Sequence, residues 1–327
     1  MRSVLLLLAS AALPLCAQVN IKQVSDRVIV EINGKPFTEL ITAADVPKPY
    51  LHPLRAASGT VVSRYYPMDL VEGESRDHPH HRGLWFTHGD VNGIDFWANE
   101  ASYKGTNLGK VVLKRINDVK SGKKEGYIDA TFEWHDPKGQ NLITEMRRMT
   151  FYAEPDKRTI DIDILLRAEV PVKFGDTKEG TFAIRLASEL EEPGPKSIKE
   201  PARNGHMVNA EGLTGEDKVW GKRSAWVDFS GSIKGEKLGV SILDHPSNPR
   251  YPTYWHARGY GLFASNIFGE RDFSRDKARD GSLSLEPGQT LQFLFRVVIH
   301  PGDAQSADIA KMQQQFAKEK PLKRKTS

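Results

Sequence analysis

Cysteine is nearly absent from this sequence: among 327 residues the one cysteine is Cys16, close to the N-terminus. If Cys16 is removed with an N-terminal signal, the mature chain has no disulfide, no thiolate nucleophile and no cysteine metal site. Stability must then come from a buried core. A chain of this length can bury a high fraction of its surface, so a large core is feasible.

Several catalytic signatures are also missing. The sequence has no P-loop, no GxGxxG opening a helix, no HExxH and no GxSxG, which removes the usual pointers to nucleotide binding, zinc peptidases and serine hydrolases. After the N-terminus no segment is apolar enough for a transmembrane helix. The net charge is +4, with much of the excess near the C-terminus. Residues 319–327 are therefore expected to form a basic disordered tail, and no nucleic-acid motif accompanies it.

The N-terminus is typical of a secretory signal. Arg2 supplies the positive charge, and an apolar stretch follows from Val4 to Leu15. That stretch is too short to span a bilayer stably. We expect residues 1–17 to be a signal peptide cleaved after Ala17, with lipidation at Cys16 as the alternative. The expected location is periplasmic or secreted.

The rest of the chain is rich in β-strand patterns. Apolar and polar residues alternate through 111–166, and Gly/Pro/Asp turns separate the segments. Period-two alternation between such turns is typical of half-buried antiparallel strands. The stretch 291–299 is apolar on both faces, which predicts a central strand. We expect a mainly β fold, a two-sheet antiparallel β-sandwich, formed by one domain over 18–318. A short C-terminal helix is expected from Ala304 to about Lys318.

Four of the ten histidines lie within eleven residues, at His78, His80, His81 and His88. Histidine is the usual proton carrier near neutral pH and the commonest metal ligand. His80 and His81 are adjacent, so in an extended segment their side chains point to opposite faces, whereas His78 and His80 share one. The cluster predicts a functional site, although any single histidine could instead bond loop backbone groups.

A second cluster lies far downstream, in two short stretches that join histidines to polar and aromatic residues. Its members are Asp244, His245, Asn248, Arg250, Trp255 and His256. Two such loops, distant in sequence, predict one pocket assembled by the fold. A polar turn also precedes the predicted strand 180–187, where Asp176 or Glu179 could act as a general acid or base. The simpler interpretation is an ordinary turn with solvated carboxylates.

Several of these phrases resemble one bacterial family known as the "PmoA family" or "methane oxygenase PmoA". They are 77–84, 88–93, 95–97, 175–180, 220–226 and 244–250. A membrane-embedded monooxygenase subunit would need spanning helices that this chain lacks, so the resemblance does not imply that activity. The family is loosely similar to the galactose-mutarotase-like supersandwich, which implies a β-sandwich and, by analogy, chemistry on sugars.

The leading hypothesis is a carbohydrate-active enzyme that uses His/carboxylate acid–base chemistry in mutarotation, glycosidic cleavage or elimination. The predicted catalytic residues are His80, His81, Glu179 and His256. A larger set is expected to bind the sugar or another small polar substrate: Arg82, Trp85, His88, Asp176, Arg185, Asp244, His245, Asn248, Arg250 and Trp255.

Two alternatives remain open. One is a metal-dependent hydrolase or oxygenase, in which His78, His80, His88 or His256 would bind a divalent metal. This hypothesis is the only one that requires a cofactor. The other is a non-catalytic glycan-binding module, in which tryptophans lie on an open face.

Overall fold

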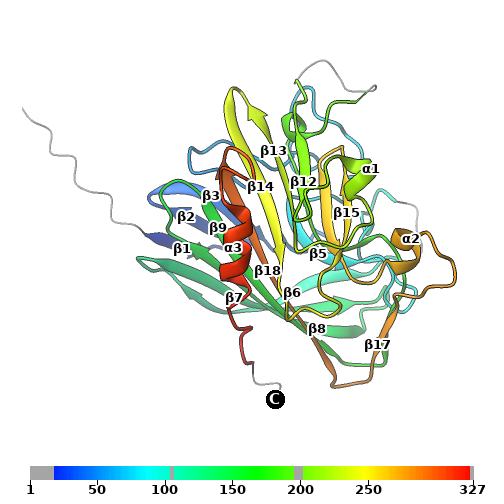
Figure 1. Ribbon diagram of the computed structural model, residues 1–327. Coiled ribbons are helices and arrows are strands. Elements are labelled where there is room, and N and C mark those ends of the chain that lie inside the picture. Colours follow the sequence, from blue (N-terminus) through cyan, green and yellow to red (C-terminus); the bar gives the residue numbers. More distant parts are fainter. Residues whose placement is uncertain (1–17, 104–106, 195–201, 325–327) are drawn as a thin grey trace, which may run out of the picture.

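The computed structural model describes residues 18–103, 107–194 and 202–324. The expected signal peptide, residues 1–17, therefore lies outside the described residues. Two eight-stranded antiparallel sheets dominate the fold and pack against each other as a sandwich (Figure 1). The mainly β fold class and the two-sheet architecture are confirmed. No helix in the described part of the chain is long and apolar enough to cross a membrane.

The first sheet has the strand order β1-β2-β3-β4-β5-β11-β16-β15. Its N-terminal half is a meander, in which the Asn33–Gly34 turn joins β2 to β3. In its other half β11 lies between β5 and β16. The strands are β1 (Val19–Gln23), β2 (Arg27–Ile32), β3 (Lys35–Ile41), β4 (Tyr50–Leu51), β5 (Leu84–His88), β11 (Gly180–Arg185), β15 (Tyr254–Arg258) and β16 (Leu262–Asn266).

The second sheet has the order β12-β13-β14-β18-β9-β8-β7-β6, and a two-stranded ribbon of β10 and β17 completes the strands described. The predicted meander corresponds to β6 through β9. The strands are β6 (Lys110–Lys120), β7 (Glu125–His135), β8 (Asn141–Tyr152), β9 (Arg158–Ala168), β10 (Val172–Phe174), β12 (His206–Asn209), β13 (Trp226–Ile233), β14 (Glu236–Asp244), β17 (Leu283–Leu285) and β18 (Thr290–Pro301).

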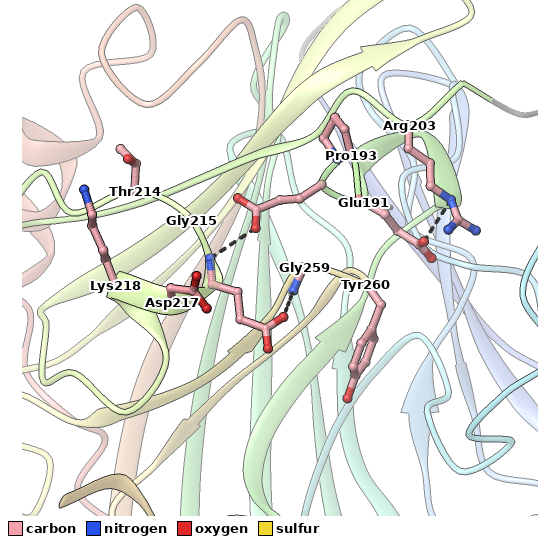
Figure 2. Close-up of a pocket in the computed structure, with 12 residues that line it drawn as sticks. Glu191, Pro193, Arg203, Thr214, Gly215, Asp217, Lys218, Gly259 and Tyr260 are labelled. Atoms are coloured by element: carbon pink, nitrogen blue, oxygen red, sulfur yellow. Dashed lines mark hydrogen bonds and ion pairs between the residues drawn. The ribbon is translucent and has the colours of Figure 1, made fainter. Parts of the chain in front are cut away.

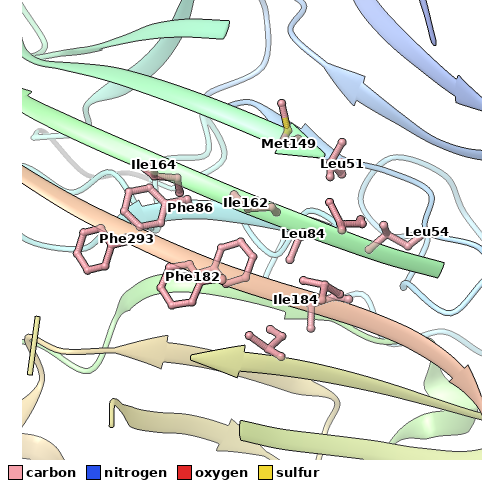
Figure 3. Packing of buried hydrophobic residues seen from close by; sticks show 14 of the residues in the cluster. Leu51, Leu54, Leu84, Phe86, Met149, Ile162, Ile164, Phe182, Ile184 and Phe293 are labelled. Atoms are coloured by element: carbon pink, nitrogen blue, oxygen red, sulfur yellow. The ribbon is translucent and has the colours of Figure 1, made fainter. Parts of the chain in front are cut away.

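The core lies between the sheets, where apolar side chains from both inner faces interdigitate (Figure 3). Phe182 on β11 stacks on Phe295 of β18, with ring centroids 4.5 Å apart. The strand β18 is central, as predicted, between β14 and β9. Its outer face is apolar too, because Leu294 and Val298 pack beneath the C-terminal helix α3 (Ile309–Phe316) (Figure 1).

The C-terminus differs from the sequence-based expectation in two ways. The helix begins at Ile309 rather than near residue 304, because Asp303 accepts hydrogen bonds within a preceding turn and Asp308 has a φ of 55°. Part of the expected disordered tail is held on the second sheet. The Leu322 amide donates to Asp163 at 2.8 Å, and Arg324 lies 3.3 Å from Asp129.

Three other short helical segments lie in loops. They are η1 (Ser188–Leu190), α1 (Glu216–Val219) and α2 (Glu270–Ser274). The α1 and α2 segments flank β15 on the outer side of the first sheet (Figure 1). These loops therefore lie near the strand that carries His256.

The inner face of β11 offers a direct test of the sandwich core. Phe182 is 1% exposed, so Phe182→Ala should lower the free energy of unfolding by about 3–5 kcal/mol, through lost burial and a cavity. Urea unfolding followed by fluorescence measures this. The control, Leu70→Ala at a position 62% exposed, should change stability by less than about 0.5 kcal/mol. Equal effects of the two substitutions would contradict the packing described.

Candidate functional site

A row of side chains in register crosses the outer face of the first sheet. Trp85 on β5 lies opposite Ala183 on β11, Ala183 opposite Ala264 on β16, and Ala264 opposite His256 on β15. Because side chains alternate along strands, Phe86 and Trp255 point into the sandwich while this row points away from it. The two small alanines leave room above the sheet, and the histidine loop and Trp97 pack there.

The histidine loop, residues 77–82, is held by one carboxylate. Asp77 accepts hydrogen bonds from two buried guanidinium groups, Arg64 at 2.6 Å and Arg185 at 3.1 Å, and pairs with His78 Nδ1 at 2.9 Å. Burial alone would raise the pKa of Asp77, but the His78 hydrogen bond and the two arginines outweigh it, so the pKa is well below its usual range. Arg185 lies on β11 and thereby anchors the loop to that strand.

Gly83 ends this loop where the backbone comes closest to β4. It has a φ of +52°, and a Cβ atom there would lie 2.2 Å from the carbonyl oxygen of Leu51. The positive φ and the close carbonyl oxygen each exclude a side chain at this position.

The loop and β15 meet at one cavity of about 440 Å³. We call it the histidine pocket. The four predicted catalytic residues, His80, His81, Glu179 and His256, all line this pocket. His80 and His256 are 176 positions apart in the sequence. Its lining residues are His78, His80, His81, Trp97, Ala98, Tyr103, Lys178, Glu179, His256, Arg258 and Tyr260.

Within the described part of the chain, His256 has a hydrogen-bond acceptor without a partner. Its Nδ1 lies 3.0 Å from the carbonyl oxygen of Lys178, so Nδ1 must carry the proton and Nε2 has the lone pair. That Nε2 is buried and has no partner among the described residues. Burial lowers the pKa of His256 to about 4, which keeps the ring neutral at pH 7.

His81 has the opposite tautomer. Arg185 Nη1 can only donate, and it lies 3.1 Å from His81 Nδ1; the His81 proton is therefore on Nε2. Burial lowers the pKa of His81 well below its usual value. His80 pairs with the Tyr103 hydroxyl at 2.8 Å, and burial, with the charge of Lys48, lowers its pKa to about 2.

His78 differs from these three because its side chain is 42% exposed. The ring is stacked between His81 and Tyr260, with centroids 4.8 and 5.4 Å away. Asp77 accepts from Nδ1, which leaves Nε2 for a ligand. Its φ of 44° is in the left-handed region, which non-glycine residues rarely adopt.

The remaining charges of the pocket are paired. Lys178 Nζ lies 2.6 Å from Glu179, and both side chains are 36% exposed. Arg258 donates to Glu216 at 2.6 Å. Glu179 is the one carboxylate in the pocket lining as described.

A buried lysine, Lys48, holds a segment of the pocket wall in place. Lys48 donates to the backbone carbonyl of Trp97 and, at 2.9 Å, to Asn99. It therefore holds the segment that carries Trp97 and Ala98. Burial, assisted by the charge of Arg82, lowers the pKa of Lys48 to about 7.

Several predicted substrate-binding residues make contacts within the protein. Arg82 forms a two-point ion pair with Glu100, at 2.7 and 2.8 Å. Trp85 is 1% exposed beneath His81, so it offers no face to a sugar. His88 is fully buried with Nε2 against the Gly175 carbonyl. Asp176 accepts backbone amide protons of Arg271 and Gly281. Arg185 is near the pocket but fully buried, and it positions His81.

The predicted second cluster does not converge on the pocket, apart from His256. Asp244 and Asn248 bond each other at 2.7 Å and fix the loop to β18; burial raises the pKa of Asp244 to about 7. His245 packs on Phe316 of α3. Arg250 donates to the carbonyls of Ile267 and Ser282, and Trp255 is a core residue.

The four metal-ligand candidates do not share one site. His88 is separated from the pocket, and His78, His80 and His256 line it. Across the described residues no group of three or more His, Cys, Asp or Glu side chains is arranged to hold a metal ion.

Sequence reasoning missed Asp77, Tyr103, Lys178, Arg258 and Tyr260. Strand alternation could have found Arg258, which is two residues after His256 and so shares its face. Tyr260 and Tyr103 come from irregular segments without any periodic signal. Asp77 lies in the histidine motif, but only the fold reveals that two remote arginines meet there.

The tautomers can be tested by ¹⁵N NMR of the imidazole rings, assigned with single-histidine variants. We expect His256 to be the Nδ1–H form and to stay neutral from pH 8 down to about 4. Since its folded pKa is lower than the unfolded value of about 6.5, its contribution to stability is present above pH 6.5. That contribution is lost as the pH falls toward 4. Titration of His256 near pH 6.5, or an Nε2–H ring, would contradict the geometry.

Solved structures with some likeness to this chain include three carbohydrate-related proteins. A heparan sulfate lyase mutant from Pedobacter heparinus has 8% identity and a TM-score of 0.39, with 88% of this chain and 36% of the lyase covered. A GH36 α-galactosidase from Geobacillus stearothermophilus has 9% identity and a TM-score of 0.38, covering 87% and 41%. A galactose mutarotase-like protein from Clostridium acetobutylicum has 10% identity and a TM-score of 0.39, covering 86% and 98%.

These TM-scores are too low to support a functional argument, and this chain spans less than half of the lyase and the galactosidase. The comparison with curated proteins found no match. One sequence family matches residues 27–314, and its description assigns no function and gives no support to the methane-oxygenase label. The chain belongs to that family, described as "Family of unknown function (DUF6807)".

Proposed function

We propose that this protein is an exported enzyme that catalyses proton transfer on a neutral sugar bound in the histidine pocket. One observation carries the proposal: a carboxylate-held imidazole, His78, and a carboxylate, Glu179, line the same cavity. Acid–base catalysis needs two such groups at one substrate. A cavity of about 440 Å³ is in the range that binds small ligands. Export rests on the N-terminal segment alone.

The lining favours some sugar reactions over others. Canonical glycoside hydrolysis uses two carboxylates, whereas Glu179 is the one carboxylate in the described lining. A uronate substrate would need a free cation, but Lys178 and Arg258 are each paired with a glutamate. The arrangement therefore supports opening and closing of a sugar hemiacetal, the reaction of mutarotation.

In this reaction Glu179 accepts the proton of the anomeric hydroxyl while protonated His78 donates a proton to the ring oxygen. The bond between the anomeric carbon and the ring oxygen breaks, and an open-chain aldehyde forms. After rotation of the aldehyde the ring closes on its other face, and both protons return. Asp77 stabilises the protonated His78. His256 Nε2 accepts a hydrogen bond from another sugar hydroxyl, which orients the ring.

The buried histidines do not transfer protons in the proposed reaction. His80 and His81 were predicted to be proton carriers, but burial keeps both rings neutral. The ring of His78 stays exposed beside a carboxylate, and we therefore assign the proton transfer to it.

The assignment predicts that Glu179→Gln and His78→Asn each slow catalysed anomer exchange by about 10²–10⁴-fold. Exchange NMR on a panel of neutral reducing aldoses, with the spontaneous rate subtracted, measures this. His135→Asn is the matched control. That imidazole also pairs with a carboxylate, Glu133, at 3.0 Å, but lies on β7 outside the pocket.

The control variant should keep the wild-type rate. If wild-type protein accelerates exchange of no aldose in the panel, or if both pocket variants match it, the proposed reaction is wrong. Binding without acceleration would instead indicate a glycan-binding module.

A further inference from the structure

A second and larger cavity adjoins the histidine pocket. It has a volume of about 640 Å³ and lies between η1, α1 and the turn after β15 (Figure 2). We call it the glutamate pocket. Its lining residues are Glu191, Glu192, Pro193, Gly194, Arg203, Thr214, Gly215, Glu216, Asp217, Lys218, Gly259 and Tyr260.

The two cavities share a wall. Tyr260 lines both of them, and Gly259 lines the glutamate pocket while its neighbour Arg258 lines the histidine pocket. Glu216 accepts hydrogen bonds from Arg258 at 2.6 Å and from the Gly259 amide at 2.7 Å. The turn at 258–260 is thus fixed in place between the two cavities.

A buried carboxylate oxygen in the glutamate pocket lacks a hydrogen bond. Glu191 is 2% exposed, and its Oε2 lies 3.1 Å from Arg203. Its Oε1 accepts no hydrogen bond from the described residues, and the Arg185 guanidinium is 3.7 Å away. An unsatisfied buried acceptor is costly. A ligand hydroxyl is the kind of donor that would satisfy it.

The charge of the cavity selects among ligands. Four carboxylates line it, those of Glu191, Glu192, Glu216 and Asp217, against two cations, Arg203 and Lys218. Such a surface repels anionic ligands. Carboxylates at the same time accept hydrogen bonds from the hydroxyls of a neutral sugar.

We infer that the glutamate pocket is a second sugar-binding subsite, so that the substrate is a neutral oligosaccharide with its reducing end in the histidine pocket. This inference rests on the proposed function, since it uses the histidine pocket as the place of the reacting sugar. Tyr260 lies between the two sugar units, and Glu191 Oε1 accepts a hydroxyl of the second unit.

Titration calorimetry with neutral oligosaccharides of one to four units, built from glucose, galactose, mannose or xylose, tests the inference. For wild-type protein, affinity should rise by about tenfold from one unit to two, the equivalent of one hydrogen bond to a charged group. Asp217→Trp fills the glutamate pocket from its exposed rim, and should abolish this gain while leaving monosaccharide affinity unchanged. Asp156→Trp, at an exposed turn remote from both cavities, should behave as wild type.

Three results would overturn the inference. If a monosaccharide binds and chain length has no effect, the second subsite is wrong while the proposed function stands. If no neutral sugar of any length binds, both are wrong. If oligogalacturonides bind more tightly than neutral chains, the argument from charge is wrong.

Discussion

The arrangement of the site depends on Asp77, whose carboxylate is bound by Arg64 and Arg185. Both guanidinium groups are fully buried, and a buried charge is tolerated only when it is paired and hydrogen-bonded. The Asp77 carboxylate forms an ion pair with Arg64 and another with Arg185, so it compensates both buried charges. Since Arg185 belongs to β11, the ion pair fixes an irregular loop to the most central strand of the site.

Burial also decides the charge of two imidazoles in the pocket. Desolvation, reinforced by Arg185 and Lys48, keeps His80 and His81 neutral. Both rings pack against neighbouring aromatic side chains. His78, by contrast, remains half exposed, and Asp77 binds one of its nitrogens. The site therefore has a rigid neutral layer against the sheet and an accessible layer that contains His78. The small residues Ala183 and Ala264 make space for the rigid layer.

The sequence specifies the fold better than it specifies the site. Alternation in 111–166 predicts antiparallel strands, because every second side chain must enter the core, and β6 to β9 lie there. The meeting of His80 with His256 in one pocket also agrees with the expectation from two histidine-bearing loops. By contrast, Asp244, His245 and Asn248 have the same residue types as a catalytic loop but act as hydrogen-bonding anchors beneath α3.

Residue type alone could not separate these two cases, because a polar side chain that satisfies buried backbone groups resembles one that awaits a substrate. Trp85 illustrates the same limit. Its neighbours suggest a sugar-stacking role, but register with Ala183 places it under His81. Tyr260 and Tyr103 gain importance only from tertiary contacts. Burial and unpartnered atoms, such as His256 Nε2, are what identify the site.

Hydrogen–deuterium exchange of Asp77→Asn tests most directly whether this carboxylate organises the pocket. The substitution keeps the side-chain shape but removes the charge that binds two arginines and His78. The account predicts faster amide exchange in residues 75–82, with β7 and β8 unchanged and with Asp156→Asn indistinguishable from wild type. Wild-type protection of 75–82 in Asp77→Asn would contradict it.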